Sequence, residues 1–543
     1  MLRFIHLTMF TAVLLGCLTA PASASVLLGR PTDQSITANV LFDQATEFYL
    51  EYGLQTGVYP SQSATFLNAA GVPREVTLTG LFPNTRYYYR LRSRSVGSST
   101  FAASPEYTFH TQRPAGSTFT FTIEADEHLY DKKGVESLYR ICLDNQALDH
   151  PDFMLSLGDI FGDDHRPDSI TSGELDTLHR NYRPFLDRIC HSVPFYVCLG
   201  NHEGENDYYL AQNPPNNLAV WGTQWRQYYY PNPEPSAFYS GNTTFEPFGI
   251  GYPENYYAWQ WGDALFVVLD VYRDQCDTSP KPKNWNWSLG QQQYQWLEQT
   301  LDTSNAAFKF VFAHHVRGQG RGGVTNARLF EWGGYEQDGV TYTFPQKRPG
   351  WTAPIHQLFV NHGVNVFFQG HDHVFAHEVL DGVTYQAMPM ACDSTYEIGM
   401  LANADAYVSD TLDGSGHLRV TVDPTCTTVE YIRAYLPADT LSGLHHNREV
   451  AFTYSVGNCL TSASHSDLFD EMELYPNPAD GSVRFRLPEG VPFSHFVLSD
   501  VFGKTVAETN YPGIELSSLP SGIYFVTAYF ADAAIKRKLI VRH

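Results

Sequence analysis

Five short polar clusters, each directly after a short apolar run, constrain the fold of this chain more than any other feature. The runs are rich in aromatic and β-branched residues, which is typical of buried strands. They span residues 119–123, 153–157, 195–199, 308–312 and 364–368, and they lead into Asp126-Glu127-His128, Gly158-Asp159, Gly200-Asn201-His202-Glu203, His314-His315 and Gly370-His371-Asp372-His373. In open α/β sheets the carboxyl edge of the strands is where ligands bind. The pattern therefore predicts an α/β domain with Asp, Asn and His side chains gathered at one edge.

The residue types in these clusters indicate a metal centre. Carboxylate, amide and imidazole donors suit Zn, Mn, Fe or Mg rather than a metal held by thiolates. A single His at a strand end is usually an ordinary surface or core residue, but ligand-type residues at five strand ends favour metal binding. The cysteines show no C-x-x-C spacing, so a cysteine zinc site is not expected.

The ordered set resembles the calcineurin-like metallophosphoesterases, which include the purple acid phosphatases and share the pattern DxH, GDxx, GNH[ED], H and GHxH. The resemblance implies two metal ions, with Fe, Mn or Zn expected and their identity open. It places the first ion on Asp126, His128, Asp159 and His373, and the second on Asp159, Asn201, His314 and His371. A bridging carboxylate such as Asp159 holds two cations about 3.5–4 Å apart, and such pairs activate water and bind phosphoryl oxygens.

Two departures from the family pattern qualify the resemblance. Purple acid phosphatases carry a Tyr ligand three residues after the bridging Asp, where this chain has Gly162. His128, which purple enzymes lack, replaces that ligand, so we expect a colourless centre. The His-x-Pro sequence after the fourth strand reads His314-His315-Val316 here, and we take His314 as the ligand because it occupies the family's ligand position.

His202 corresponds to the family's catalytic His, which contacts phosphate or protonates the leaving oxygen. General acid catalysis of this kind accelerates a reaction about 10²–10⁴-fold. The alternative role for His202 is to hydrogen-bond to the metal ligands. Glu203 and Asp372 are candidate acceptors for the ligand imidazoles. After Asp159, residues 163–165 are expected to be solvated loop residues, with contact to metal or substrate as the alternative.

Two loops are candidates for substrate contact. Residues 317–323 are glycine-rich and include Arg317 and Arg321, whose guanidinium groups suit bidentate phosphate binding. The alternative is a surface loop with solvated charges. Residues 204–257 form a long insertion rich in Tyr, Trp, Asn and Pro. Its aromatic rings either stack on a base or sugar or pack as an ordinary loop, and such loops often shape specificity.

Net charge limits the kind of partner. The 543 residues carry a formal net charge of −23. This argues against duplex nucleic acid or an anionic membrane as the main partner, because both require a basic face. A small phosphorylated substrate attracted by a local pair of cations remains the expected ligand.

The N-terminus has the features of a secretion signal. Arg3 precedes an apolar stretch over residues 7–15 and an Ala22-Ser23-Ala24 cleavage site, which predicts a signal peptide over residues 1–24. A competing interpretation is a lipoprotein box that ends at Cys17. No other stretch reaches about 18 apolar residues, so no transmembrane segment is expected.

Seven cysteines follow the signal, and this odd number leaves at least one free thiol.

Composition shifts divide the mature chain into three domains. Residues 25–113 alternate apolar and polar side chains over short runs, which predicts an antiparallel sandwich. Within them, residues 81–91 resemble the fibronectin type III-like domain that precedes the catalytic domain of purple acid phosphatases. Residues 117–455 form the metallophosphoesterase domain, expected as a four-layer α/β/β/α sandwich with helices over 174–189 and 291–301. All-β sandwich domains are expected on both sides of it.

Residues 465–543 contain four motifs in a characteristic order. They begin at Tyr475, Asp500, Leu519 and Lys536, and together they resemble the C-terminal sorting domain of the type IX secretion system of Bacteroidetes. The resemblance implies a small β-sandwich read by an outer-membrane machine, with the protein secreted or attached to the cell surface. The alternative is a carbohydrate-binding or adhesive domain.

These features together predict a secreted two-metal phosphoesterase. A monoesterase is our first expectation, because the domain pairing is that of acid phosphatases. A phosphodiesterase or nucleotide hydrolase is the alternative, because diesterases also use the Asp-x-His site. A third hypothesis is that the protein is not an enzyme but a surface binding protein that retains the metal-binding fold.

Overall fold

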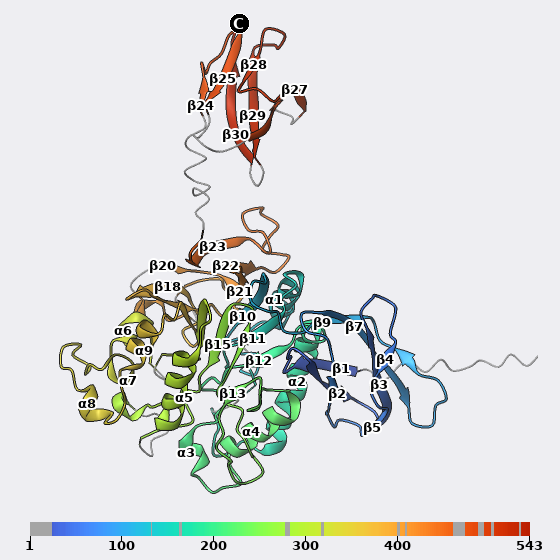
Figure 1. Cartoon of the computed structure of the whole chain (residues 1–543), viewed down its shortest axis with the longest axis vertical. Helices are drawn as coiled ribbons and strands as arrows, with labels where there is room; N and C mark the ends of the chain where they lie inside the picture. The colour runs from blue at the N-terminus through green and yellow to red at the C-terminus, as the bar shows by residue number, and fades with distance from the viewer. Residues whose placement is uncertain are drawn as a thin grey trace, which may run out of the picture. The chain divides into compact units, whose positions relative to one another are not determined.

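The computed structural model describes residues 24–131, 133–161, 165–276, 283–316, 320–398, 402–407, 410–459, 473–486, 493–500, 504–530 and 534–543 (Figure 1). The chain forms two compact units, residues 1–458 and 459–543. Several predictions concern positions outside the described residues, namely the signal peptide up to residue 23, Cys17, Gly162, Asp163, Asp164 and Arg317.

The first unit begins with an antiparallel β-sandwich, as predicted. One sheet contains β1 (Ala24–Gly29), β2 (Ser35–Phe42) and β6 (Arg74–Thr79). The other contains β3 (Thr46–Gly53), β4 (Ser61–Gln62), β5 (Phe66–Asn68), β7 (Arg86–Ser95), β8 (Ala102–Ala103) and β9 (Tyr107–His110). Alternate residues of β7 point inward and pack against the facing sheet. The alternation arises because side chains on a strand point to opposite faces.

Two mixed sheets form the centre of the unit (Figure 1). The first runs in the order β12 (Phe195–Val197), β11 (Phe153–Ser156), β10 (Phe119–Glu124), β21 (Ser415–Val422), β22 (Cys426–Ala434) and β23 (Val450–Gly457). The second runs in the order β13 (Ser240–Gly241), β14 (Tyr257–Trp261), β15 (Ala264–Val268), β16 (Phe308–Phe312), β17 (Val366–Gln369), β19 (Val383–Ala387), β18 (Phe375–Leu380) and β20 (Asp410–Leu412). Phenylalanine rings from both sheets, such as Phe121 and Phe266, interdigitate in the core between them.

Helices cover the outer faces of both sheets and confirm the four-layer prediction. The apolar sides of α1 (Glu136–Leu148) and α2 (Ser172–Cys190) pack on the first sheet. Those of α5 (Gly290–Thr303) and α9 (Ile355–Asn361) pack on the second. Thr171 and Glu174 form a capping box that starts α2. Outside the insertion over residues 204–257, the remaining short helices of the described residues are η1 (Asn284–Asn286), α6 (Val324–Ala327), α7 (Phe330–Gly333), α8 (Phe344–Lys347) and η2 (Ala404–Ala406).

The five predicted strands all form, and their pairing brings the polar clusters to one edge. β10, β11 and β12 are mutually parallel, as are β15, β16 and β17. Parallel neighbours end at the same side of a sheet, so the residues that follow them lie close together.

The insertion over residues 204–257 is packed and partly helical. It contains α3 (Asp207–Leu210) and α4 (Leu218–Tyr229), and Asn217 caps α4 by accepting a hydrogen bond from the Val220 N–H. Tyr229 and Tyr230 are buried, and their rings pack against His179 and Phe161. These aromatic residues therefore build the core beside α2 and are not exposed to a substrate.

The second unit is a small antiparallel β-sandwich. One sheet contains β24 (Glu473–Tyr475), β25 (Ser482–Arg486) and β28 (Gly513–Glu515), and the other contains β26 (Phe493–Ser499), β27 (Thr505–Thr509), β29 (Gly522–Phe530) and β30 (Ala534–Val541). Asn477 of the first predicted motif hydrogen-bonds the backbone of β30 at Lys538 and Ile540. The sequence motif thus ties the start of the unit to its last strand.

Two further expectations concern cysteines and membrane spans. Cys426 and Cys459 are disulfide-bonded, and the described free thiols are Cys142, Cys190, Cys198, Cys276 and Cys392. Within the described residues, every helix is too short or too polar to cross a bilayer.

A buried arginine joins the N-terminal sandwich to the central domain. The Arg183 side chain on α2 is 1% exposed and donates five hydrogen bonds. The acceptors are the hydroxyl and carbonyl oxygens of Ser25, the amide and carbonyl oxygens of Asn39, and the carbonyl of Tyr229. Each guanidinium nitrogen has a hydrogen-bond acceptor, which offsets the free energy needed to remove this charged group from water.

We expect Arg183→Ala to lower the free energy of unfolding by about 3–5 kcal/mol, because it leaves buried acceptors without donors and opens a cavity. Urea denaturation of the full chain measures this change. Arg188→Ala on the same helix is the matched control, since Arg188 forms an exposed ion pair with Asp144 and its loss should cost less than about 1 kcal/mol. Equal effects of the two substitutions would contradict the anchoring role of Arg183.

Candidate metal centre

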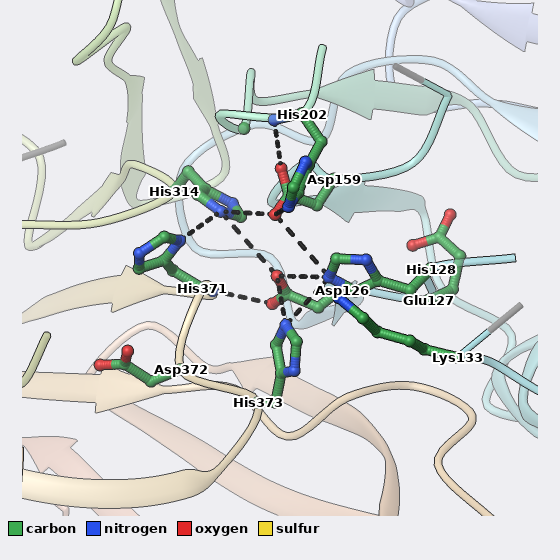
Figure 2. Close-up of polar contacts among 12 residues, drawn as sticks. Asp126, Glu127, His128, Lys133, Asp159, His202, His314, His371, Asp372 and His373 are labelled. Atoms are coloured by element: carbon green, nitrogen blue, oxygen red, sulfur yellow. Dashed lines mark hydrogen bonds and ion pairs between the residues drawn. The ribbon is translucent and has the colours of Figure 1, made fainter. Parts of the chain in front are cut away.

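The residues predicted as metal ligands lie at the ends of five strands. They follow β10, β11, β12, β16 and β17, in that order: Asp126 and His128, Asp159, Asn201, His314, and His371 and His373. The side chains of Asp126, His128, Asp159, His314, His371 and His373 point toward one another (Figure 2). Five of these residues have positive φ angles, namely Asp126, His128, Asp159, His371 and His373. Positive φ costs a non-glycine residue about 1–3 kcal/mol and is often found at functional sites.

Short distances connect these side chains into two overlapping groups. In the first, the Nε2 atoms of His128 and His373 are 2.9 Å apart, and His373 Nε2 lies 3.6 Å from Asp126 Oδ1. In the second, His314 Nε2 lies 3.2 Å from both Asp159 Oδ2 and His371 Nδ1. His128 Nε2 is 3.8 Å from Asp159 Oδ2. The Asp159 carboxylate thus lies within reach of both groups, where a bridging ligand is expected.

The donor atoms in these groups suit a cation. Asp126, His128 and His373 have ligand atoms close enough to share one ion, as do Asp159, His314 and His371. Among the described residues, four buried ligand atoms lack a hydrogen-bond partner: Asp126 Oδ1, Asp159 Oδ2, Asn201 Oδ1 and His371 Nε2. Buried polar atoms are nearly always paired, so unpaired acceptors grouped in this way are explained by metal ions. The clusters are therefore consistent with a dinuclear site.

Glu203 holds backbone rather than a ligand imidazole, contrary to our expectation, whereas Asp372 lies 3.7 Å from the imidazole of His315, which is not a predicted ligand. Glu203 accepts hydrogen bonds from the backbone N–H groups of Asp159, Ile160 and Gly200, and so joins the turns after β11 and β12. Burial, reinforced by the charge of Asp159, raises the pKa of Glu203 to about 7.

Asp372 similarly holds the turn that carries His371. It accepts hydrogen bonds from Tyr407 Oη at 2.7 Å, the Gly322 N–H at 2.8 Å and Arg321 Nη1 at 3.0 Å. Arg321 Nη1 also donates to the His371 carbonyl at 2.6 Å. The Arg321 side chain is 47% exposed, so its contact with a substrate stays a prediction, but its role in holding this turn was missed.

The groups that contact the second ring nitrogen of the ligand histidines could not be identified from the sequence motifs. His314 Nδ1 lies 2.7 Å from the Leu157 carbonyl. His128 Nδ1 lies 3.0 Å from Tyr130 Oη and 3.5 Å from an Asp131 oxygen. Such contacts at one ring nitrogen leave the other available to a metal. The only signal for Tyr130 and Asp131 in the sequence is their position two and three residues after His128.

His202 lies beside the ligands with its side chain 16% exposed. Its backbone N–H donates to Asp159 Oδ1 at 2.8 Å, and its Nε2 lies 3.7 Å from Asp159 Oδ2. The side chain of Lys133, 40% exposed, extends toward His128 and pairs with Asp131 at 3.0 Å (Figure 2). The motifs gave no reason to select Lys133.

Comparisons with known proteins agree with this geometry. Residues 119–375 match the model of the calcineurin-like phosphoesterase family, and residues 473–542 match that of the secretion system C-terminal sorting domain. Among solved structures, the chain is similar to PhoD at 17% identity, with a TM-score of 0.55 over 80% of this chain and 90% of that one. It is also similar to purple acid phosphatase PPD1 from seeds of yellow lupin (Lupinus luteus), at 16% identity, with a TM-score of 0.52 over 80% of this chain and 74% of that one.

A comparison with curated proteins returned no significant match. The two structural similarities show the fold, and the family match adds the metal-dependent chemistry that the buried His and Asp clusters support. The sorting domain indicates secretion or attachment to the cell surface through the type IX machinery. The chain thus contains a metal-dependent phosphoesterase domain of the calcineurin-like family, over residues 119–375, and a type IX secretion sorting domain over residues 473–542.

Proposed function

We propose that this protein is a secreted hydrolase of phosphate monoesters that uses two metal ions. The observation that supports this most strongly is the meeting of six predicted ligands from four strand ends, namely Asp126, His128, Asp159, His314, His371 and His373. Three of their buried atoms lack a hydrogen-bond partner, as does the buried Oδ1 atom of Asn201. One ion is assigned to Asp126, His128, Asp159 and His373, and the other to Asp159, Asn201, His314 and His371. Fe, Mn and Zn all suit these oxygen and nitrogen donors.

The residues around the ions have separate tasks in this proposal. Bound cations supply a nucleophilic water at neutral pH and stabilise charge on the phosphoryl oxygens. Asp159 reaches both groups and fixes their spacing. His202, partly exposed beside Asp159, contacts the phosphate or donates a proton to the leaving oxygen. Lys133, Arg321 and Arg317 are the candidate cationic contacts for a small phosphorylated substrate.

The N-terminal sandwich favours a monoesterase over the alternatives. Its pairing with the catalytic domain resembles that of acid phosphatases, and one structural neighbour is a purple acid phosphatase. His128 at the Asp-x-His position supports a phosphodiesterase or nucleotide hydrolase as the second candidate. We propose a signal peptide over residues 1–24, followed by domains over residues 25–113, 117–455 and 465–543.

Asp159→Ala should reduce the metal content from about two ions to one or fewer per chain, because it removes the shared ligand. Asn201→Ala should reduce occupancy of the second site alone. Elemental analysis of purified protein measures both. His377→Ala, a substitution in β18 away from the strand ends, serves as the control and should retain both ions. Unchanged metal content and activity in both ligand variants would refute the ligand assignment.

Metal uptake should release about one proton per chain at pH 8. Burial lowers the pKa of His314, but the carboxylates of Asp159 and Asp126 outweigh burial and raise this pKa from 6.5 to about 10. In metal-free protein this raised pKa stabilises the fold fully below pH 6.5, and the contribution is lost as the pH rises through about 10. A bound cation must displace the proton, so metal affinity should weaken as the pH falls.

Titration calorimetry in buffers of different ionisation enthalpy measures this proton release. A His314→Asn variant should bind metal more weakly and release no such proton. Binding by the unaltered protein without proton release at pH 8 would contradict a protonated His314 in the metal-free protein.

His202→Ala should lower kcat for a nitrophenyl phosphate monoester about 10²–10⁴-fold while both metal ions remain bound. His150→Ala, at an exposed position before β11, should leave kcat unchanged. The same assay with a nitrophenyl phosphate diester decides between the two candidate activities. A diester hydrolysed faster than the monoester would overturn the monoesterase proposal in favour of the diesterase.

A further inference from the structure

Three aromatic rings surround the imidazole of His202. The ring of His165 lies parallel to it, with centroids 4.9 Å apart and an interplanar angle of 17°. The ring of His128 meets it edge-on at 5.2 Å, and the ring of Tyr130 lies 5.7 Å away. His165 is exposed in a turn, as expected for a solvated loop residue, and its ring also lies within stacking distance of the proposed catalytic imidazole.

Tyr130 links this group of rings to the metal ligands. Its hydroxyl lies 3.0 Å from His128 Nδ1, and its ring centroid lies 6.1 Å from that of His165. His128 in turn lies 3.8 Å from Asp159, whose carboxylate accepts the His202 N–H. The backbone of His202 is therefore fixed by Asp159, while its ring is flanked by side chains from the loops after β10 and β11.

The orientation of a histidine ring depends on its packing partners. The backbone hydrogen bond leaves the χ1 and χ2 torsions of His202 undetermined, so several staggered rotamers compete unless neighbouring groups exclude them. An imidazole in offset parallel contact removes rotamers that would swing the ring away from Asp159. Small misplacements of a catalytic group reduce turnover strongly, so the stacking partner matters for rate.

We propose that His165, together with Tyr130, is a positioning residue that holds the His202 ring against the metal centre by aromatic stacking. This inference rests on the proposed function, in which His202 acts on the substrate. Stacking on His202 requires an aromatic ring at position 165 but does not require the nitrogen atoms of histidine. A phenylalanine at position 165 should therefore replace the histidine, whereas an alanine should not.

The test compares His165→Phe and His165→Ala in the full-length, metal-loaded protein, with a nitrophenyl phosphate monoester as substrate. His165→Ala should lower kcat about tenfold with KM and metal content nearly unchanged. His165→Phe should keep kcat within about twofold and leave the pH profile unaltered. His150→Ala again controls for loss of an exposed histidine.

A double substitution shows whether His165 acts through His202. In a His202→Ala background, the further change His165→Ala should have no additional effect on kcat, because residues that act as a unit are not additive. The proposal is overturned if His165→Phe is as impaired as His165→Ala, if His165→Ala has full activity, or if the double variant is clearly slower than His202→Ala.

A measurement that needs no turnover separates this proposal from the proposed function. In protein labelled with ¹³C-histidine, the ring resonances of His202 should shift in His165→Ala and return toward their original positions in His165→Phe. Absence of turnover in the unaltered protein would refute the phosphoesterase proposal while these shifts still report the stacking. Unchanged His202 resonances in His165→Ala would refute the stacking itself.

Discussion

The buried carboxylate of Asp159 is the contact on which the organisation of the site depends. One of its oxygens accepts the His202 N–H, and the other faces the imidazoles of His314 and His128. Burial alone would raise the pKa of this carboxyl, but the neighbouring imidazoles of His314, His202 and His128 hold it well below its usual range. An ionised carboxylate with an unpaired oxygen in a buried site requires positive charge nearby, and two cations would provide it.

The two-sheet architecture explains how that carboxylate meets residues from distant parts of the chain. β11 delivers Asp159 from the first sheet, and β16 delivers His314 from the second. The sheets are held face to face by rings such as those of Phe121 and Phe310. A change in the thickness of this core would alter the distance between the two halves of the metal centre, since packed interiors relax only partially.

Two acidic side chains hold the backbone of the turns that carry the ligands. Glu203 joins two turns through N–H groups, and Asp372 with Arg321 holds the turn of His371. Such hydrogen bonds are needed in a site built on turns with positive φ angles, because a strained backbone conformation persists only where surrounding contacts hold it in place. The ligand rings are held by the Leu157 carbonyl, the Tyr130 hydroxyl and the Asp131 carboxylate.

The strands, the order of the ligand residues, the four-layer arrangement and the two flanking β-domains were all predictable from local patterns. Runs of apolar residues and the motifs after them are properties of neighbouring residues, and a family resemblance connects them. What the sequence could not reveal depends on contacts between distant segments. These include the burial of Tyr229 and Tyr230 beside α2, the donors of Arg183 that reach Ser25 and Asn39, and the stacking of His165 on His202. The sequence alone determined which residues end the strands, whereas the tertiary structure decided which side chains surround them, because those contacts depend on packing across the whole domain.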